Sequence, residues 1–102
     1  MSLSSREILS KAPVVPVLVI EDVNDAVPLA KALVAGGLPV LEITLRSSAA
    51  EESIKRIIAE VPDAITGAGT VVNAKQMERM AEIGCAFAVS PGHTEGLLKA
   101  AK

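Results

Sequence analysis

Short runs rich in β-branched residues alternate along this chain with stretches that carry the apolar spacing of helices. We predict strands over residues 14–20, 40–45, 65–67 and 87–90, the first of them after a brief N-terminal helix. Consecutive strands begin 22 to 26 residues apart. This spacing leaves room for one helix in each interval, so the chain repeats a strand–helix unit without an internal linker.

Polar caps and glycines mark where the predicted helices begin and end. Capping-box patterns open three of them, at residues 4–7, 48–51 and 73–76. Asn24 is expected to cap the helix that follows the first strand, which places Pro28 near its first turn, where proline is tolerated. Gly36, Gly37 and Gly84 stand where left-handed C-terminal caps belong.

Strands joined by helical crossovers must run parallel, and parallel sheets are normally covered on both faces. Two α/β architectures satisfy this condition: an open doubly wound sheet and part of a (βα)8 barrel. The short repeat favours a compact barrel, of which four units form one half. We therefore predict that residues 1–102 are a single unit, a parallel (βα)4 half of a TIM barrel preceded by a short N-terminal helix.

The composition changes how this half-barrel is understood. Half of the 102 residues are hydrophobic (50%). A domain of this size hides only about two thirds of its unfolded surface, so one small core cannot comfortably cover so much apolar side chain. We expect the remainder to meet further barrel units or another copy of the chain.

Composition and charge also exclude several classes of protein. The longest apolar run, residues 13–20, is far shorter than the roughly 18–20 residues that span a bilayer, so we expect no membrane partner. The N-terminus lacks a basic region followed by an apolar core, which argues against a secretory signal and for a cytoplasmic location. A net charge of −2 and a single phenylalanine argue against binding of nucleic acid.

The chain has one cysteine, Cys85, and one histidine, His93. They cannot supply an internal disulfide or a metal cluster, and we expect neither a metal nor another cofactor. Cys85 is expected to be a small core residue rather than a reactive thiol. His93 lies in a glycine-containing loop, where a surface or capping role is favoured over acid–base chemistry.

The most informative strand alternates three aliphatic residues with three polar ones: Leu41, Glu42, Ile43, Thr44, Leu45 and Arg46. If the aliphatic face packs under helices, the polar side chains share the inner face near the carboxyl end of the strand, where barrels carry their active sites. The alternative is a solvent-facing strand with an ordinary glutamate–arginine pair. A parallel strand between crossover helices has no obvious wet face, which favours the first interpretation.

A glycine-containing segment, residues 67–70, directly follows the third strand. Its glycines would let the backbone approach a ligand closely, and Thr70 would offer a hydroxyl. A tight turn between strand and helix explains the same residues equally well. A dinucleotide fingerprint would need a further glycine where Val72 stands, so a Rossmann site is disfavoured.

Taken together, five motifs resemble 2-keto-3-deoxy-6-phosphogluconate (KDPG) aldolases, in the same order along the chain: residues 14–20, 32–37, 41–46, 67–71 and 90–92. The likeness covers essentially the whole chain and corresponds to the N-terminal half of the family. It implies a metal-free class I aldolase on a (βα)8 barrel, typically a homotrimer. Such enzymes act in the Entner–Doudoroff pathway and form pyruvate and glyceraldehyde 3-phosphate; many also cleave 4-hydroxy-2-oxoglutarate.

The resemblance implies roles for four residues. Glu42 would be the general acid/base, moving protons at the carbinolamine and at the substrate hydroxyl. Arg46 would bind the carboxylate of the pyruvyl group, for which its forked guanidinium is suited. Thr70 would contact the same group, and Pro91 would line the pocket.

One part of the family pattern has no counterpart. The resemblance places the Schiff-base lysine on the sixth strand and the phosphate site on the last two, beyond the motifs matched here. The lysines of this chain fall in predicted helices or at their ends, at positions 11, 31, 55, 75, 99 and 102. We therefore expect the isolated chain to be inactive as an aldolase. Two other hypotheses stay open: a half-barrel that associates with itself, as a dimer for example, and a small keto-acid-binding module without catalysis.

Overall fold

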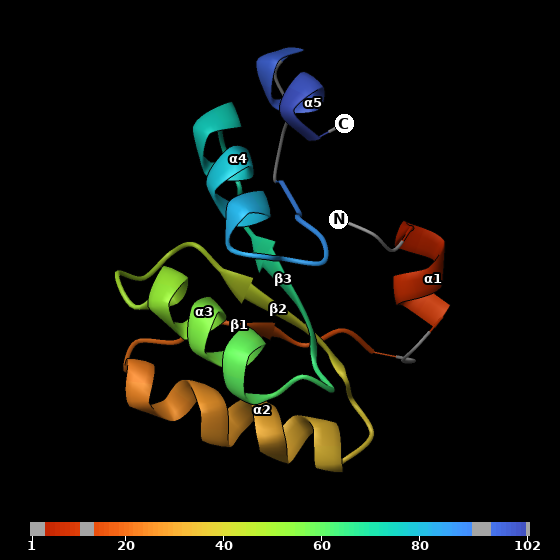
Figure 1. Ribbon diagram of the computed structural model, residues 1–102, viewed down its shortest axis with the longest axis vertical. Coiled ribbons are helices and arrows are strands. Elements are labelled where there is room, and N and C mark those ends of the chain that lie inside the picture. The colour runs from red at the N-terminus through yellow and green to blue at the C-terminus, as the bar shows by residue number, and fades with distance from the viewer. Residues whose placement is uncertain (1–3, 11–13, 91–94, 102) are drawn as a thin grey trace.

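The computed structural model describes residues 4–10, 14–90 and 95–101. Helices and strands alternate as the pattern predicts (Figure 1): α1 (Ser5–Ser10), β1 (Val17–Leu18), the 3-10 helix η1 (Val23–Asp25), α2 (Ala26–Ala35), β2 (Val40–Thr44), α3 (Ala50–Glu60), β3 (Ile65–Gly69), α4 (Ala74–Glu82) and α5 (Glu95–Ala101). The three strands are all parallel and lie in the order β1-β2-β3. The prediction of a parallel α/β unit with a leading helix is confirmed.

The fourth predicted strand is present only in part. Ala88 forms a single parallel bridge to Ala68 of β3. Around it, the amides of Ala86 and Val89 donate to the carbonyls of Thr66 and Ala68, each at 2.8 Å. Residues 86–89 therefore continue the sheet beyond β3 in the direction expected for a fourth barrel strand.

The first strand is shorter than predicted, two residues in place of residues 14–20. The Pro16 carbonyl accepts a hydrogen bond from the Glu42 amide at 3.0 Å, but its nitrogen carries no hydrogen to donate in return. β1 also has a neighbour on one side only within the described sheet. The regular ladder therefore includes only Val17 and Leu18, which pair with Glu42 and Ile43.

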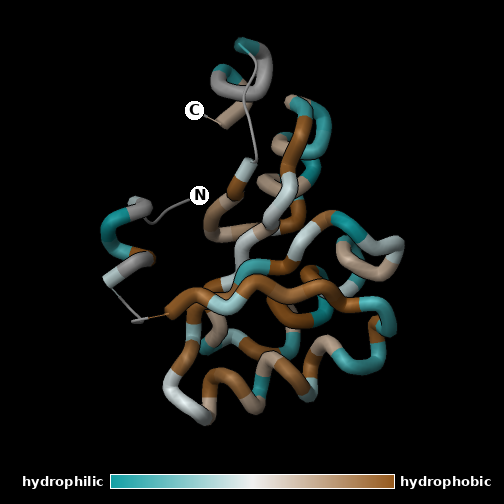
Figure 2. Tube along the Cα trace, turned by 180° about the vertical axis from the view of Figure 1, so that it is seen from behind, coloured by the Kyte–Doolittle hydropathy of each residue, from teal (hydrophilic) through white to brown (hydrophobic). Residues whose placement is uncertain are grey.

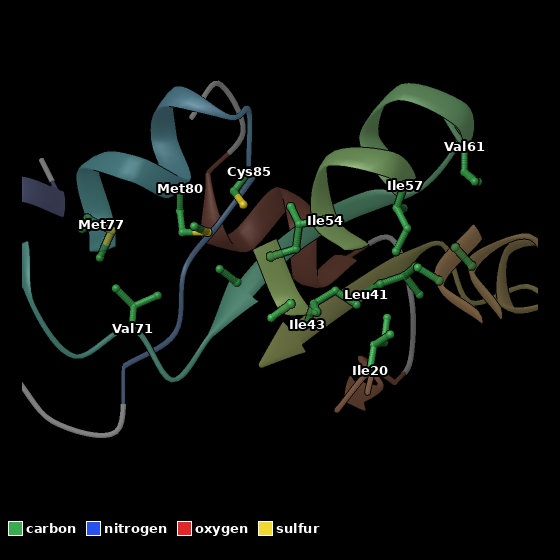
Figure 3. Packing of buried hydrophobic residues seen from close by; sticks show 14 residues of the cluster. Ile20, Leu41, Ile43, Ile54, Ile57, Val61, Val71, Met77, Met80 and Cys85 are labelled. Atoms are coloured by element: carbon green, nitrogen blue, oxygen red, sulfur yellow. The ribbon is translucent and has the colours of Figure 1, made fainter. Parts of the chain in front are cut away.

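The core lies between the strands and the helices α3 and α4. Figure 3 shows the isoleucines of α3 reaching toward Leu41 and Ile43 of β2. At the other end of the core, Met80 of α4 and Cys85 pack in the same cluster. Burial raises the pKa of the Cys85 thiol to about 12, so it is a protonated apolar side chain at neutral pH. Its predicted role as a core residue is confirmed.

Two of the three predicted capping boxes are confirmed, because their side chains reach the first backbone amides of a helix. The Ser4 hydroxyl accepts from the Glu7 amide at 3.1 Å, at the start of α1. Asn73 caps α4 by accepting from the Gln76 amide at 2.8 Å. At the opposite ends of helices, Gly37 and Gly84 adopt φ values of +92° and +96°, as left-handed caps require. Gly36 has a φ of −82°, so the prediction of a left-handed cap is wrong for this residue.

The predicted caps at Ser48 and Asn24 are wrong. α3 begins one residue after Ala49, which has no side chain able to cap it. Before α2 the chain inserts the turn η1, where Asp22 accepts from the Asn24 amide at 2.9 Å. In both places a tight turn intervenes between strand and helix and shifts the helix start away from the polar residue.

The helices α2 and α3 lie side by side along one face of the sheet, and α4 packs against α5 (Figure 1). Seen from behind, the strands form a largely hydrophobic centre while the helices alternate hydrophobic and hydrophilic turns (Figure 2). None of the helices in the described part of the chain has the length and hydropathy needed to cross a bilayer. The cytoplasmic location stays a prediction.

Candidate functional site

The polar residues of β2 lie on the face turned away from the α3 core. Leu41 and Ile43 are fully buried in that core, which confirms that the aliphatic residues pack under helices. Because side chains alternate along a strand, Glu42 and Thr44 point to the opposite, inner face. They are nevertheless only 9% and 3% exposed, so the inner face holds its polar groups in a largely dry environment.

Glu42 occupies a position that neighbouring glycines make possible. Its Cα partner on β3 is Gly67, but a Cβ built on the next inner-face residue, Gly69, would lie 2.9 Å from Cδ of Glu42 and closer still to its Oε2. The carboxylate therefore lies over Gly69, and the ring of Phe87 lies over Gly67. Burial raises the pKa of Glu42 above its usual value of 4.5.

Arg46 and Thr70 meet where β2 and β3 end. Arg46 Nε donates to Thr70 Oγ1 at 3.2 Å, which fixes the guanidinium and leaves its Nη groups for other acceptors. Thr70 has a φ of +57°, a left-handed conformation that a β-branched residue adopts only at a cost. Backbone strain of this kind clusters at ligand sites, and here it directs the hydroxyl toward Arg46.

These residues line one cavity of about 290 Å³ on the inner face. Glu42, Thr44, Arg46 and Thr70 provide its polar wall, and three valines provide much of the rest: Val17, Val19 and Val89. The structure thus brings together three of the four predicted site residues. The fourth, Pro91, lies outside the described residues, as does His93. A largely buried carboxylate in the same cavity as a cationic guanidinium suits a small anionic ligand that undergoes proton transfer.

A larger cavity of about 380 Å³ lies between the N-terminal ends of α3 and α4. Its prominent charged groups already neutralise one another, because Arg79 Nη2 lies 2.6 Å from Glu51 Oε1. This ion pair raises the pKa of Arg79 further. Beside this ion pair, Lys75 is the other charged side chain that lines the larger cavity. The inner-face cavity combines a largely buried carboxylate with a guanidinium and is the better candidate site.

No lysine lies on the inner face among the described residues. Those that the structure describes are on α2, α3, α4 and α5: Lys31, Lys55, Lys75 and Lys99. In the same part of the chain no three His, Cys, Asp or Glu side chains are grouped so that they could hold a metal ion. Within the described chain, the site thus contains a carboxylate, a guanidinium and a hydroxyl, but no amine nucleophile.

Gly69 and Phe87 are the site residues that the sequence analysis missed. The third strand is predicted to end at Gly67, and residues 67–70 are predicted as a turn or a ligand-binding loop. In the structure β3 continues to Gly69, and side chains of this same protein fill the space above Gly67 and Gly69. The sequence does contain a signal for these residues: the third strand has glycine at alternate positions, and the neighbouring second strand carries an inward glutamate. Small residues opposite large ones indicate interlocking side chains.

Comparisons with known proteins match this chain to aldolases. A family model described as KDPG and KHG aldolase matches residues 5–102. A 2-dehydro-3-deoxy-phosphogluconate aldolase from Pseudoalteromonas atlantica is 62% identical over 97 residues, which are 95% of this chain and 45% of that protein. The KHG/KDPG aldolase of Escherichia coli strain K12 is 56% identical over 98 residues, or 96% of this chain and 46% of that protein.

Solved structures agree with these relatives. KDPG aldolase of Zymomonas mobilis with 3-phosphoglycerate matches with a TM-score of 0.88 and 58% identity, covering 94% of this chain and 46% of that one. KDPG aldolase of Legionella pneumophila, with pyruvate captured as a covalent carbinolamine, matches with a TM-score of 0.93 and 42% identity, covering 98% and 48%. The chain spans about half the length of the curated relatives it matches.

Proposed function

Because the chain belongs to the KDPG and KHG aldolase family, we propose that it supplies the pyruvyl-binding and proton-transferring half of a class I aldolase. The reaction would cleave KDPG to pyruvate and glyceraldehyde 3-phosphate, or 4-hydroxy-2-oxoglutarate to pyruvate and glyoxylate. One observation carries the proposal. A buried carboxylate, that of Glu42, shares a small cavity with the guanidinium of Arg46 at the carboxyl ends of parallel strands.

Arg46 and Thr70 would bind the carboxylate common to both substrates. Since Nε of Arg46 is engaged by the Thr70 hydroxyl, the guanidinium is held with its Nη edge available for a two-point contact with a carboxylate. Thr44 contributes no free donor, because its hydroxyl donates to the Leu18 carbonyl at 3.2 Å. Recognition of the pyruvyl carboxylate would therefore depend on Arg46, with the Thr70 hydroxyl beside it, and not on Thr44.

Glu42 would carry the protons of the reaction. Burial raises the pKa of Glu42 and so favours its protonated form. A carboxyl group in reach of the substrate can donate a proton in one step and accept one in the next. It could thus deliver a proton as water leaves the carbinolamine and take one from the substrate hydroxyl as the carbon–carbon bond breaks. By resemblance, the lysine that forms the Schiff base comes from the part of an aldolase that these motifs do not cover.

A chimeric aldolase tests this proposal. We expect the enzyme in which this chain replaces the matched 46% of the E. coli KHG/KDPG aldolase to release pyruvate from KDPG. Arg46→Ala should raise KM by about 10- to 100-fold, since a charge-assisted hydrogen bond contributes roughly 1.5–3 kcal/mol. The measurement is a coupled pyruvate assay over a range of KDPG concentrations.

Arg56→Ala is the matched control, because among the described residues Arg56 pairs with Glu52 alone, on the exposed surface of α3. It should leave KM unchanged. The proposal fails if the chimera folds but releases no pyruvate, or if the alanine variants at positions 46 and 56 behave alike. As a further control, the isolated 102-residue chain is expected to give no pyruvyl adduct after borohydride reduction.

We also propose that the half-barrel associates with copies of itself. Val17 and Val19 of the edge strand region are 61% and 54% exposed on the inner face, an unusual placement for apolar side chains beside a buried site. Sedimentation velocity is expected to show concentration-dependent association of the chain, and Val17→Lys should weaken it. Val72→Lys is the control, since Val72 is 51% exposed but does not line the inner-face cavity. A stable monomer at every concentration would contradict self-association.

A further inference from the structure

The two glycines on the inner face of β3 are not required by the backbone. In the described chain the left-handed glycines are Gly37 and Gly84, so Gly67 and Gly69 have φ values that other residues could also adopt. Glycine in a strand interior also weakens the strand, because it contributes no packing and gains most entropy on unfolding. Their value must therefore lie in the space that a missing Cβ leaves free.

Each of these spaces is filled by one particular side chain. A Cβ on Gly67 would overlap the ring of Phe87, and one on Gly69 would overlap the carboxyl end of Glu42. The three atoms nearest to a Cβ at position 69 all belong to Glu42: Oε2, Cδ and Cγ. The space over Gly67, directly across from Glu42, is thus filled by an aromatic ring. The space left for the carboxylate lies over Gly69, the next inner-face residue toward the carboxyl end of β3.

Packing, rather than bonding, holds the carboxylate in this place. Within the described residues we find no hydrogen bond or ion pair to the side chain of Glu42, although it is only 9% exposed. Of the other side chains that line its two cavities, Arg46 alone is charged. A carboxylate that no described protein group holds by a hydrogen bond is oriented by the neighbours that limit its room.

We propose that Gly67, Gly69 and Phe87 form a seat that aims the Glu42 carboxylate at the end of the strands where Arg46 and Thr70 lie. Gly69 and Phe87 are then positioning residues. The ring of Phe87 occupies the space over Gly67, and the missing Cβ of Gly69 leaves room for the carboxylate. Thr70 follows Gly69 directly, so the seat places the carboxylate next to the strained residue that holds Arg46. The catalytic meaning of this seat rests on the proposed function, but its existence does not.

Gly69→Ala in the 102-residue chain tests the seat by a measurement that needs no catalytic activity. The added methyl group should push the flexible end of Glu42 out of its place and toward water. The chemical shift of the Glu42 carboxyl carbon, followed by NMR as a function of pH, reports the pKa of this group. We expect that pKa to fall toward the usual glutamate value of 4.5. An unchanged midpoint in a folded variant would overturn the proposal.

A double-mutant cycle provides a second, independent measurement. With Glu42 present, Gly69→Ala should lower the melting temperature or leave it unchanged. In a Glu42→Ala background the clash is gone, and the same substitution should raise it, since alanine suits a strand better than glycine does. Gly36→Ala is the control: its Cβ would meet only backbone oxygens, the nearest at 3.4 Å, so its effect should be the same in both backgrounds. Additive effects at positions 69 and 42 would overturn the seat.

The chimeric aldolase separates this inference from the proposed function. If the chimera is active and Gly69→Ala lowers kcat by about tenfold or more with little change in KM, both stand. If the chimera is inactive while the NMR midpoint and the cycle respond as expected, the seat stands and the proposed function fails. If the chimera is active and neither of those two measurements responds, the function stands and the seat is wrong.

Discussion

Replacing Glu42 by glutamine is expected to lower the rate of aldol cleavage by about 10²- to 10⁴-fold in an aldolase that carries this chain, the range typical for loss of a general acid/base. Glutamine keeps the size and the place over Gly69 but can neither release nor accept a proton at neutral pH. The carboxylate of the substrate would still be bound by Arg46, whose contact with Thr70 does not involve Glu42. We therefore expect kcat to fall while KM stays within a few-fold of its original value.

The measurement is again the pyruvate assay on the chimera, with Glu60→Gln as the control. Glu60 is exposed at the last position of α3 and does not line the inner-face cavity. Its replacement should leave both kinetic constants unchanged. Equal rates for the two glutamine variants would remove Glu42 from the reaction.

The same substitution should not weaken the fold, which separates a chemical effect from an unfolding effect. Because burial raises the pKa of Glu42, the folded chain holds this proton more tightly than the unfolded chain does. The folded chain therefore loses stability as pH rises from the usual value of 4.5 through the raised value. Glutamine has no such loss. Urea denaturation of the 102-residue chain should show that, as pH rises across that range, the free energy of unfolding of the glutamine variant increases relative to that of the original protein.

The local pattern of the chain predicts which face of β2 packs against the helices and which carries the polar residues. Alternation of aliphatic and polar residues depends only on strand geometry, so it predicts correctly that Ile43 faces the helices and Glu42 the inner face. The capping of α4 by Asn73 is equally local, because donor and acceptor are three residues apart. Parallel topology follows from the lengths of the connections. These features need no knowledge of what lies across the sheet.

The details of the site depend on contacts between distant parts of the chain. Gly69 and Glu42 belong to different strands, and the use of the glycine becomes visible only once β2 and β3 are in register. The contact of Arg46 with Thr70 likewise joins the ends of two strands. The truncation of β1 depends on the direction in which Pro16 faces its neighbour. Sequence patterns alone identify the residue types, whereas the register decides which of them meet.

Ile57→Ala is expected to have the largest effect on stability, a loss of about 2–5 kcal/mol in the free energy of unfolding. Ile57 is fully buried, and Figure 3 shows it between α3 and Leu41 of β2. Truncation leaves a cavity that a close-packed core cannot collapse to fill. A domain of this size is stable by only about 5–15 kcal/mol, so much of the chain's stability would be lost.

Ile58→Ala makes the same chemical change one residue further along α3, where the side chain is only half-buried. Urea denaturation followed by circular dichroism should show a clearly smaller loss for this variant, and equal losses would contradict the packing described here. Since α3 supports the face of β2 opposite to Glu42, the two variants also test how the site depends on the core. The pKa of Glu42 should differ from that of the original protein in the Ile57→Ala variant under conditions where this variant is still folded. The reason is that the strand carrying the carboxylate has lost part of its packing against α3.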